Sequence, residues 1–159
     1  MFLDHPPREG ICIYGHFNKT RGFGAQAYYP EVDQFITILR DPFERAISLY
    51  FHNKRKIEEG GSNNFGFNSS DLESYLRTTK SNYLNQFPFD VTRDNFEHLI
   101  NKYFIHIGTT ENLEASIRII AKKLGFSAPE NIKNLNVIER NEKVPYNLKQ
   151  EFIDNHQMG

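Results

Sequence analysis

Apolar residues recur along the chain with the spacings of strands and helices, most clearly in residues 35–52, FITILRDPFERAISLYFH. The apolar residues of 35–39 predict a buried strand of about five residues. Asp41 is suited to cap a helix, and Pro42 suits the first helical position because proline lacks the N–H that would be unpaired there. The run therefore predicts a strand that passes directly into a helix ending near Ile57.

Two other short apolar runs predict strands. Residues 11–14 (ICIY) predict a strand buried on both faces, and residues 103–107 (YFIHI) predict another. Together with 35–39 they give three strands alternating with helices, which indicates an α/β fold with a parallel sheet. Ligands bind beyond the carboxyl ends of the strands in such sheets. Those ends are followed in this sequence by His16, Arg40 and Gly108.

Capping residues and helical spacing predict further helices. Residues 70–73 (SDLE) fit a capping box, and Thr92 is suited to cap the next helix. The clearest amphipathic pattern covers 113–124, and Gly125 provides its C-terminal stop. A last helix is expected to begin near Asn147.

Composition and charge limit the classes of function. The 159 residues are expected to form a single domain over 1–159, and a net charge of −1 provides no overall basic field for binding nucleic acid. The only cysteine, Cys12, excludes an internal disulfide and a Cys-rich zinc site, and we interpret it as a core thiol. No apolar window approaches the length of a membrane span and the first residues do not resemble a signal peptide, so a cytoplasmic protein without a membrane partner is expected. The 14 Phe and 8 Tyr are interpreted mostly as core.

Arg40 marks the strongest candidate for chemistry. A strand that ends in arginine and turns at once into a helix places a guanidinium beside free backbone N–H groups, which is an arrangement that binds anions. Two other motifs are weak. Residues 22–27 (GFGAQA) imitate a dinucleotide fingerprint but do not follow a strand directly, and Lys19 lacks the glycine spacing of a phosphate-binding loop.

With these elements in order, the chain resembles the sulfotransferases that use 3′-phosphoadenosine 5′-phosphosulfate (PAPS), particularly the carbohydrate branch that includes heparan sulfate 2-O-sulfotransferase. The resemblance covers most of the chain and is strongest in FITILRDPFERAISLY. In that family an arginine at the strand end and a serine eight residues later hold the 3′-phosphate, which implies these roles for Arg40 and Ser48. A residue seven places past Asp41 lies two turns along the same helix face, so the spacing suits the role. The alternative is a helix-start ion pair and a tolerated helix serine.

Three shorter segments resemble the family in the right order. YGHF resembles the segment that carries the catalytic base, NYLNQF resembles an amide-bearing segment near the cleft, and YFIHIGTTENL resembles the family's late strand and helix. A further segment, LNVIERNEKVP, resembles a loop that closes over the nucleotide. The alternative for the histidine is a loop residue with no special role. The resemblance implies His16 as catalytic base, Asn82 and Gln86 as substrate-binding residues, and Asn136 and Arg140 as nucleotide-binding residues.

The resemblance implies transfer of a sulfuryl group from PAPS to a hydroxyl, with a glycan as the expected acceptor and no metal. It also implies a P-loop-like three-layer parallel sheet flanked by helices. The family's first strand and phosphate loop have no counterpart before His16, and the chain stops where the family's last helix should continue. The chain is therefore expected to be truncated at both ends, and without the phosphate loop it is expected to transfer little sulfate. The missing strand would leave apolar surface for a second copy, so a homodimer is considered.

Two alternatives of other classes remain. The chain could be a non-catalytic nucleotide- or anion-binding module that keeps the 3′-phosphate pocket without holding the sulfate. A P-loop kinase relative is disfavoured, because neither a Walker A sequence nor an acidic magnesium ligand after a strand is evident.

Overall fold

A computed structural model describes residues 12–19, 22, 24–61, 71–79, 83–132 and 144–156. The chain divides into two compact units. We call Met1–Leu39 with Asn82–Ile132 the sheet unit, and Arg40–Ser81 with Lys133–Gly159 the helical unit. No helix in the described part of the chain is long and apolar enough to cross a membrane.

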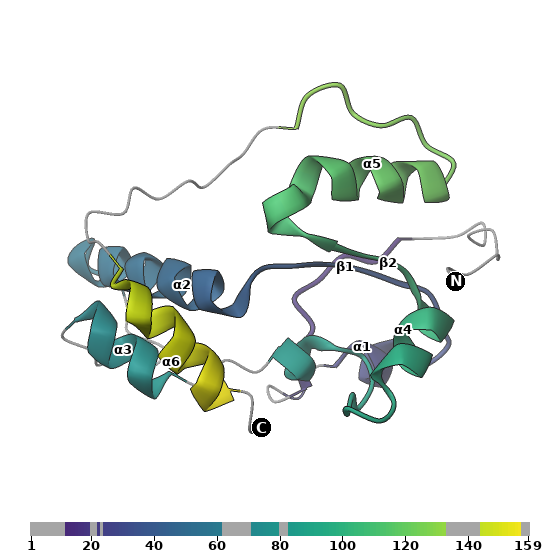
Figure 1. The fold of residues 1–159 in the computed structure, drawn as a ribbon. Helices are drawn as coiled ribbons and strands as arrows, with labels where there is room; N and C mark the ends of the chain where they lie inside the picture. Colours follow the sequence, from purple (N-terminus) through teal and green to yellow (C-terminus); the bar gives the residue numbers. More distant parts are fainter. Residues whose placement is uncertain are drawn as a thin grey trace. The chain divides into compact units, whose positions relative to one another are not determined.

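The sheet unit is built on two parallel strands, β1 (Phe35–Leu39) and β2 (Phe104–Thr109). Phe35 pairs with Phe104, whereas Ile36 pairs with His106, so the register shifts by one residue at the start of β1. Helix α5 lies on one face of this sheet, with α1 and α4 on the other (Figure 1). The helical elements of the unit are α1 (Ala25–Tyr28), the 3-10 helix η2 (Tyr83–Gln86), α4 (Phe96–Tyr103), the 3-10 helix η3 (Thr110–Asn112) and α5 (Leu113–Lys123).

Helix α5 packs tightly against the sheet at Gly108. A Cβ atom at this position would lie 2.5 Å from Cβ of Ser116 and 2.7 Å from Cδ1 of Ile38. The Ser116 hydroxyl accepts a hydrogen bond from the N–H of Thr109 at 3.1 Å, which ties α5 to the end of β2. At the other end of α5 Gly125 has φ of 76°, as the sequence predicts for a C-terminal stop. The predicted strand, turn and amphipathic helix are thus confirmed.

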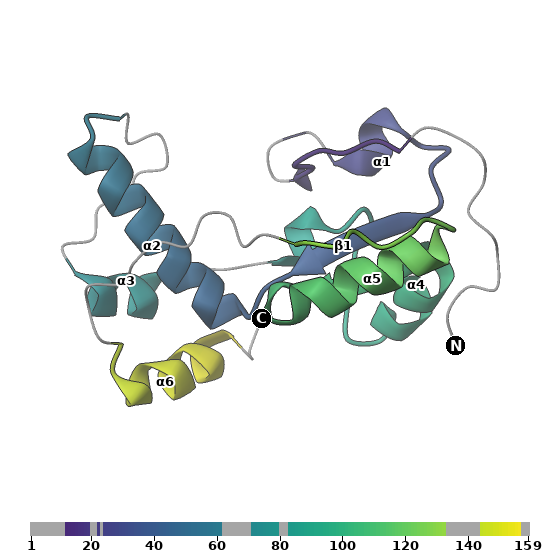
Figure 2. The ribbon, with the colours of Figure 1, turned by 90° about the horizontal axis from the view of Figure 1, so that it is seen from above.

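The helical unit consists of α2 (Pro42–Glu58), α3 (Leu72–Thr78) and α6 (Tyr146–His156). The three helices lie side by side in both views of the ribbon (Figures 1 and 2). Apolar side chains from all three form its core, because each helix presents an apolar face to the others. The buried members are Phe43, Ala46, Ile47, Tyr50, Phe51, Leu72, Leu76, Leu148 and Phe152.

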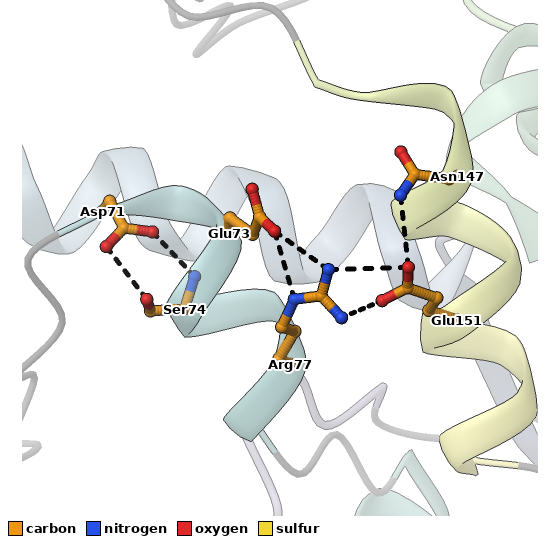
Figure 3. Close-up of polar contacts among 6 residues, drawn as sticks. All are labelled: Asp71, Glu73, Ser74, Arg77, Asn147 and Glu151. Atoms are coloured by element: carbon orange, nitrogen blue, oxygen red, sulfur yellow. Dashed lines mark hydrogen bonds and ion pairs between the residues drawn. The ribbon is translucent and has the colours of Figure 1, made fainter.

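An exposed ion-pair network also joins α3 to α6 (Figure 3). Arg77 on α3 donates to Glu73 in its own helix at 2.9 Å and to Glu151 on α6. Asn147 donates to the same Glu151 carboxylate at 3.2 Å. The hydrogen bond to Glu73, and then the charges of Glu151 and Glu73, raise the pKa of the Arg77 guanidinium above its usual range. Ion pairs between exposed side chains add little to stability. The network therefore serves mainly to align α3 with α6, and packing of the core supplies most of the stability of the helical unit.

The prediction of a strand at 11–14 is wrong for the residues that the structure describes. Residues 12–14 have no strand pairing, and both Ile13 and Tyr14 are exposed. Cys12 is exposed as well, so its interpretation as a core thiol is also wrong. A short apolar run becomes a buried strand only where the rest of the fold supplies neighbours on both faces, and the run itself does not reveal whether they exist.

Two predicted helix starts are displaced. Helix α4 begins at Phe96 with Asn95 at the N-cap, because Thr92 starts a turn in which its carbonyl accepts from the N–H of Phe96 at 3.2 Å. Helix α3 is capped by Asp71, whose carboxylate accepts from the N–H of Ser74 at 2.8 Å. The predicted cap at residue 70 lies outside the described residues.

The third strand of the predicted sheet is not found in the described part of the chain, which shows a mixed α/β arrangement with a two-stranded parallel sheet.

Candidate functional site

The junction between β1 and α2 has the local geometry that the sequence predicts. Helix α2 begins at Pro42, directly after its cap Asp41. The Asp41 carboxylate accepts a hydrogen bond from the N–H of Glu44 at 3.0 Å, so one of the helix's unpaired N–H groups is satisfied by the cap. The turn therefore brings Arg40 to the positive end of the α2 dipole.

Arg40 and Ser48 follow the spacing of one face of α2, with Glu44 between them. The guanidinium of Arg40 lies 4.0 Å from the Glu44 carboxylate, and the two side chains are 34% and 33% exposed. A separation of 4.0 Å is a loose ion pair rather than a hydrogen bond. Ser48 is half-buried. An anion that contacts both Arg40 and Ser48 would thus have to compete with the Glu44 carboxylate.

Lys149 adds a cation to this junction from α6. Its ammonium lies 3.5 Å from the Asp41 carboxylate and 6.0 Å from the centre of the Phe43 ring. The contact depends on docking of α6, whose Leu148 and Phe152 are buried in the core of the helical unit. Sequence reasoning missed Lys149, since 108 residues separate it from Asp41 and no local signal links them.

Lys149 changes the charge balance of the junction. Among residues 40–45 the two arginines and two carboxylates cancel, so the lysine leaves one net positive charge on the cluster. This excess charge is local, because the chain as a whole carries a net charge of −1. The cluster is formed by Arg40, Asp41, Glu44, Arg45 and Lys149.

The other predicted site residues lie elsewhere or outside the described part of the chain. His16 is exposed in the sheet unit, with its ring 5.9 Å from that of Tyr14. Gln86 is exposed at the end of η2 in the same unit. Arg40 and Ser48 belong to the helical unit. Three predicted residues, Asn82, Asn136 and Arg140, lie outside the described residues.

Lys19 is engaged within the sheet unit. Its ammonium donates to the carbonyl of Phe89 at 2.9 Å and forms an ion pair with Asp90. The hydrogen bond from Lys19, and then its charge, hold the pKa of the Asp90 carboxyl below its usual range. Residues 25–28 form only one turn of helix, so 22–27 do not have the strand–turn–helix context of a dinucleotide fingerprint. Neither motif therefore forms a phosphate site of the usual kind.

Neither potential metal ligands nor comparisons with known proteins help to assign a function. Among the residues that the structure describes, no group of three or more His, Cys, Asp or Glu could hold a metal ion. Comparisons of the chain with protein-family models, curated proteins and solved structures find no match. The proposed function therefore rests on the chain's own residues.

Proposed function

We propose that this protein is a PAPS-dependent sulfotransferase that transfers a sulfuryl group to a hydroxyl of a glycan. The observation that carries the proposal is Arg40 in the turn between β1 and α2, with Ser48 half-buried two turns along the same helix. This is the position that the resemblance implies for binding of the 3′-phosphate. The P-loop-like three-layer sheet of that family is part of the proposal.

The nucleotide half of the proposal rests on charge and hydrogen-bond donors. The Arg40 guanidinium can donate two parallel hydrogen bonds to a phosphate, and the Ser48 hydroxyl can donate another. Lys149 contributes positive charge at Asp41, which otherwise opposes the approach of an anion. The Glu44 carboxylate must leave the loose pair with Arg40 when the phosphate binds.

The transfer step is an in-line displacement at sulfur. The acceptor oxygen forms a bond to sulfur as the bond from sulfur to the 5′-phosphate oxygen breaks, and adenosine 3′,5′-bisphosphate leaves with the electron pair. His16 takes the proton of the acceptor hydroxyl. Charge is spread over the equatorial oxygens, as in phosphoryl transfer, so positioning and cationic stabilisation supply most of the catalysis.

Calorimetry with adenosine 3′,5′-bisphosphate tests the nucleotide half. Losing a charge-assisted contact costs about 1.5–3 kcal/mol, so Arg40→Ala should weaken binding at least roughly tenfold. Arg55→Ala is the matched control, because Arg55 is an exposed arginine of the same helix that pairs with Glu59 at 3.9 Å. Adenosine 5′-monophosphate, which lacks the 3′-phosphate, should bind wild type and Arg40→Ala alike. Equal affinity of wild type and Arg40→Ala for the bisphosphate would contradict the assignment.

Two more variants test the surroundings and the base. Glu44→Gln should tighten bisphosphate binding, because it removes the carboxylate that competes for Arg40. In a form of the protein that carries the missing phosphate loop, His16→Ala should lose transfer rate by about 10²–10⁴-fold and keep nucleotide affinity, as expected of a general base outside the nucleotide site. Unchanged turnover in His16→Ala would exclude that role.

A non-catalytic binding module is the second candidate. The observation that favours it is the contact of Lys19 with the Phe89 carbonyl and the Asp90 carboxylate, because the lysine is then occupied in a structural contact. Both candidates predict that Arg40→Ala weakens bisphosphate binding. Only the sulfotransferase predicts transfer of labelled sulfate to a glycan once the missing phosphate loop is supplied, whereas a module would show none.

A further inference from the structure

One face of helix α2 carries a row of basic side chains. Arg45, Leu49, His52 and Lys56 follow one another at intervals of four, three and four residues, which places them on one face of the helix. Leu49 is 39% exposed and His52 is exposed, whereas Arg45 and Lys56 are half-buried. We call these four residues the basic face.

The opposite side of α2 is occupied by the core of the helical unit. Phe43, Ile47 and Tyr50 are buried there with apolar side chains of α3 and α6. Both of these helices lie on the same side of α2 in the ribbon (Figure 2). The basic face is therefore turned away from the core of its own unit.

Positive charge is concentrated along this helix. From residue 45 to 57 the sequence has four lysines and arginines and no aspartate or glutamate, although the chain as a whole has a net charge of −1. The cap Asp41 lies one turn before Arg45, and the Lys149 ammonium lies 3.5 Å from its carboxylate and counters its charge. The basic face thus holds a local excess of positive charge along about 16 Å of helix.

The turn after α2 holds Lys56 in place. The N–H of Gly61 donates to the carbonyl of Lys56 at 2.8 Å, and the N–H of Gly60, which has φ of 77°, donates to the carbonyl of Ile57 at 2.9 Å. A Cβ atom at Gly61 would lie 2.7 Å from Cγ of Lys56, so the glycine leaves room for the lysine stem. One end of the basic face is therefore positioned before a partner binds, which lowers the entropic cost of binding.

Spacing and charge select the class of partner. Intervals of four, three and four residues are those by which one helix packs along another. Helices that lie on a membrane surface need a broad apolar face, whereas the apolar face of α2 is buried in the core. Nucleic-acid binding is typical of domains with a strongly basic overall charge, which this chain lacks. Two full charges with Leu49 between them match a helix that presents carboxylates and an apolar side chain.

We propose that the basic face of α2 binds an acidic amphipathic helix of a partner protein. Carboxylates of that helix pair with Arg45 and Lys56, and one of its apolar side chains packs on Leu49. Charge complementarity of this kind sets the specificity and the rate of association. The inference does not depend on the proposed function, because Leu49 and Lys56 lie outside the cluster at the junction of β1 and α2.

A synthetic helix tests the proposal. The probe is an alanine-based peptide of about 20 residues, which is long enough to be helical in isolation. It carries glutamates to meet Arg45, His52 and Lys56 and a leucine to meet Leu49. The control peptide has glutamine in place of each glutamate. At low salt, the fluorescence anisotropy of the labelled glutamate peptide should rise in a saturable manner when the full chain is added, and that of the glutamine peptide should not.

Three variants of the chain locate the contact. Lys56→Glu should weaken binding of the glutamate peptide about five- to thirtyfold, and Leu49→Ala about three- to tenfold. Arg55→Glu is the matched control, because it makes the same change in net charge at a residue about 100° around the helix. Arg55 pairs there with Glu59 at 3.9 Å. This control should weaken binding by no more than about twofold.

A charge swap completes the test. A peptide with lysine in place of the glutamate that meets Lys56 should bind Lys56→Glu more tightly than it binds wild type. This gain shows that the variant is folded and that the two side chains are paired. Failure of the lysine peptide to prefer Lys56→Glu would contradict the pairing.

The remaining outcomes separate this inference from its competitors and from the proposed function. Absence of binding between wild type and the glutamate peptide overturns the inference, and so does an equal loss in Lys56→Glu and Arg55→Glu, because the attraction would then be general. Tighter binding of phosphatidylserine vesicles or of poly(dT) than of the peptide would make the face a membrane or nucleic-acid site, with the same consequence. Adenosine 3′,5′-bisphosphate should bind Lys56→Glu as it binds wild type, so failure of the peptide test leaves the proposed nucleotide site standing.

Discussion

Aromatic side chains of the helical unit differ in burial from those of residues 12–29 in the sheet unit. In the helical unit Phe43 and Phe152 are buried and meet edge-on at 5.4 Å, and Tyr50 packs against Phe51 at 5.3 Å. In the sheet unit, the Tyr14 ring is 86% exposed, whereas Phe87 and Phe104 are buried. The contrast therefore lies between rings that reach a core and rings of the segment at 12–29.

The difference follows from local structure. Helices α2, α3 and α6 each present an apolar face, so their aromatic residues meet in one interior. Among the described residues between 12 and 29, the only α-helix is the single turn α1, which contains no buried residue. A segment without regular apolar periodicity cannot direct its rings to one side. Composition alone therefore does not separate core rings from exposed rings.

The sharpest way to break this comparison is to remove one ring from each unit. Phe152→Ala should lower the free energy of unfolding by about 3–5 kcal/mol, because it leaves a cavity in the core beside Phe43. Tyr14→Ala should change it by no more than about 0.5 kcal/mol. Urea denaturation of both variants measures the difference. A loss for Tyr14→Ala as large as that for Phe152→Ala would show that the Tyr14 ring is packed in solution.

A pair of glycine substitutions makes the same comparison within the sheet unit. Gly108→Ala should lower the free energy of unfolding by about 1–3 kcal/mol, because the new Cβ would overlap Ser116 on α5 and Ile38 on β1. Gly15→Ala is the control, since its Cβ would meet only the side chain of Phe17, at 3.0 Å, in an exposed segment. Denaturation curves should place Gly15→Ala close to wild type. Equal stability of Gly108→Ala and wild type would mean that α5 is not held against the sheet at this point.

Predictions from sequence succeed where the signal is local. Asp41 and Pro42 fix the start of α2, and the apolar run at 35–39 fixes β1, because each signal acts through neighbouring residues. Gly125 ends the helix that its spacing predicts for the same reason. The placement of Ser48 two turns along α2 follows from these elements, so its location is predictable although its role stays a prediction.

Features that depend on distant contacts could not be predicted. The run at 11–14 has the composition of a buried strand, but burial requires partners that the run itself does not specify. Lys149 approaches Asp41 only because α6 packs on α2, and its sequence context is an ordinary helix surface. Tyr14, in the run at 11–14, is predicted to be buried for a similar reason, because hydrophobicity does not show which rings find neighbours.

The last and smallest prediction concerns His106 on β2. The pH dependence of the free energy of unfolding should distinguish this partly buried residue from the surface of the sheet unit. Burial, and then the charge of Lys123, hold the pKa of His106 below its usual value of 6.5. The Lys123 ammonium donates to the carbonyl of Ile105 at 2.6 Å, which keeps it beside this strand. The folded protein therefore favours the neutral imidazole.

The sign of the pH effect follows from that preference. Well above pH 6.5 the imidazole is neutral in both states, and its contribution to stability is constant. As the pH falls below 6.5 the unfolded chain takes up a proton before the folded protein does, so the free energy of unfolding decreases until the lower folded-state pKa is passed. His106→Gln should remove this decrease, whereas replacement of the exposed His98 by glutamine should leave it unchanged. Urea denaturation at a series of pH values measures the three profiles. Parallel profiles for wild type and His106→Gln would mean that the imidazole of His106 is solvated in the folded protein.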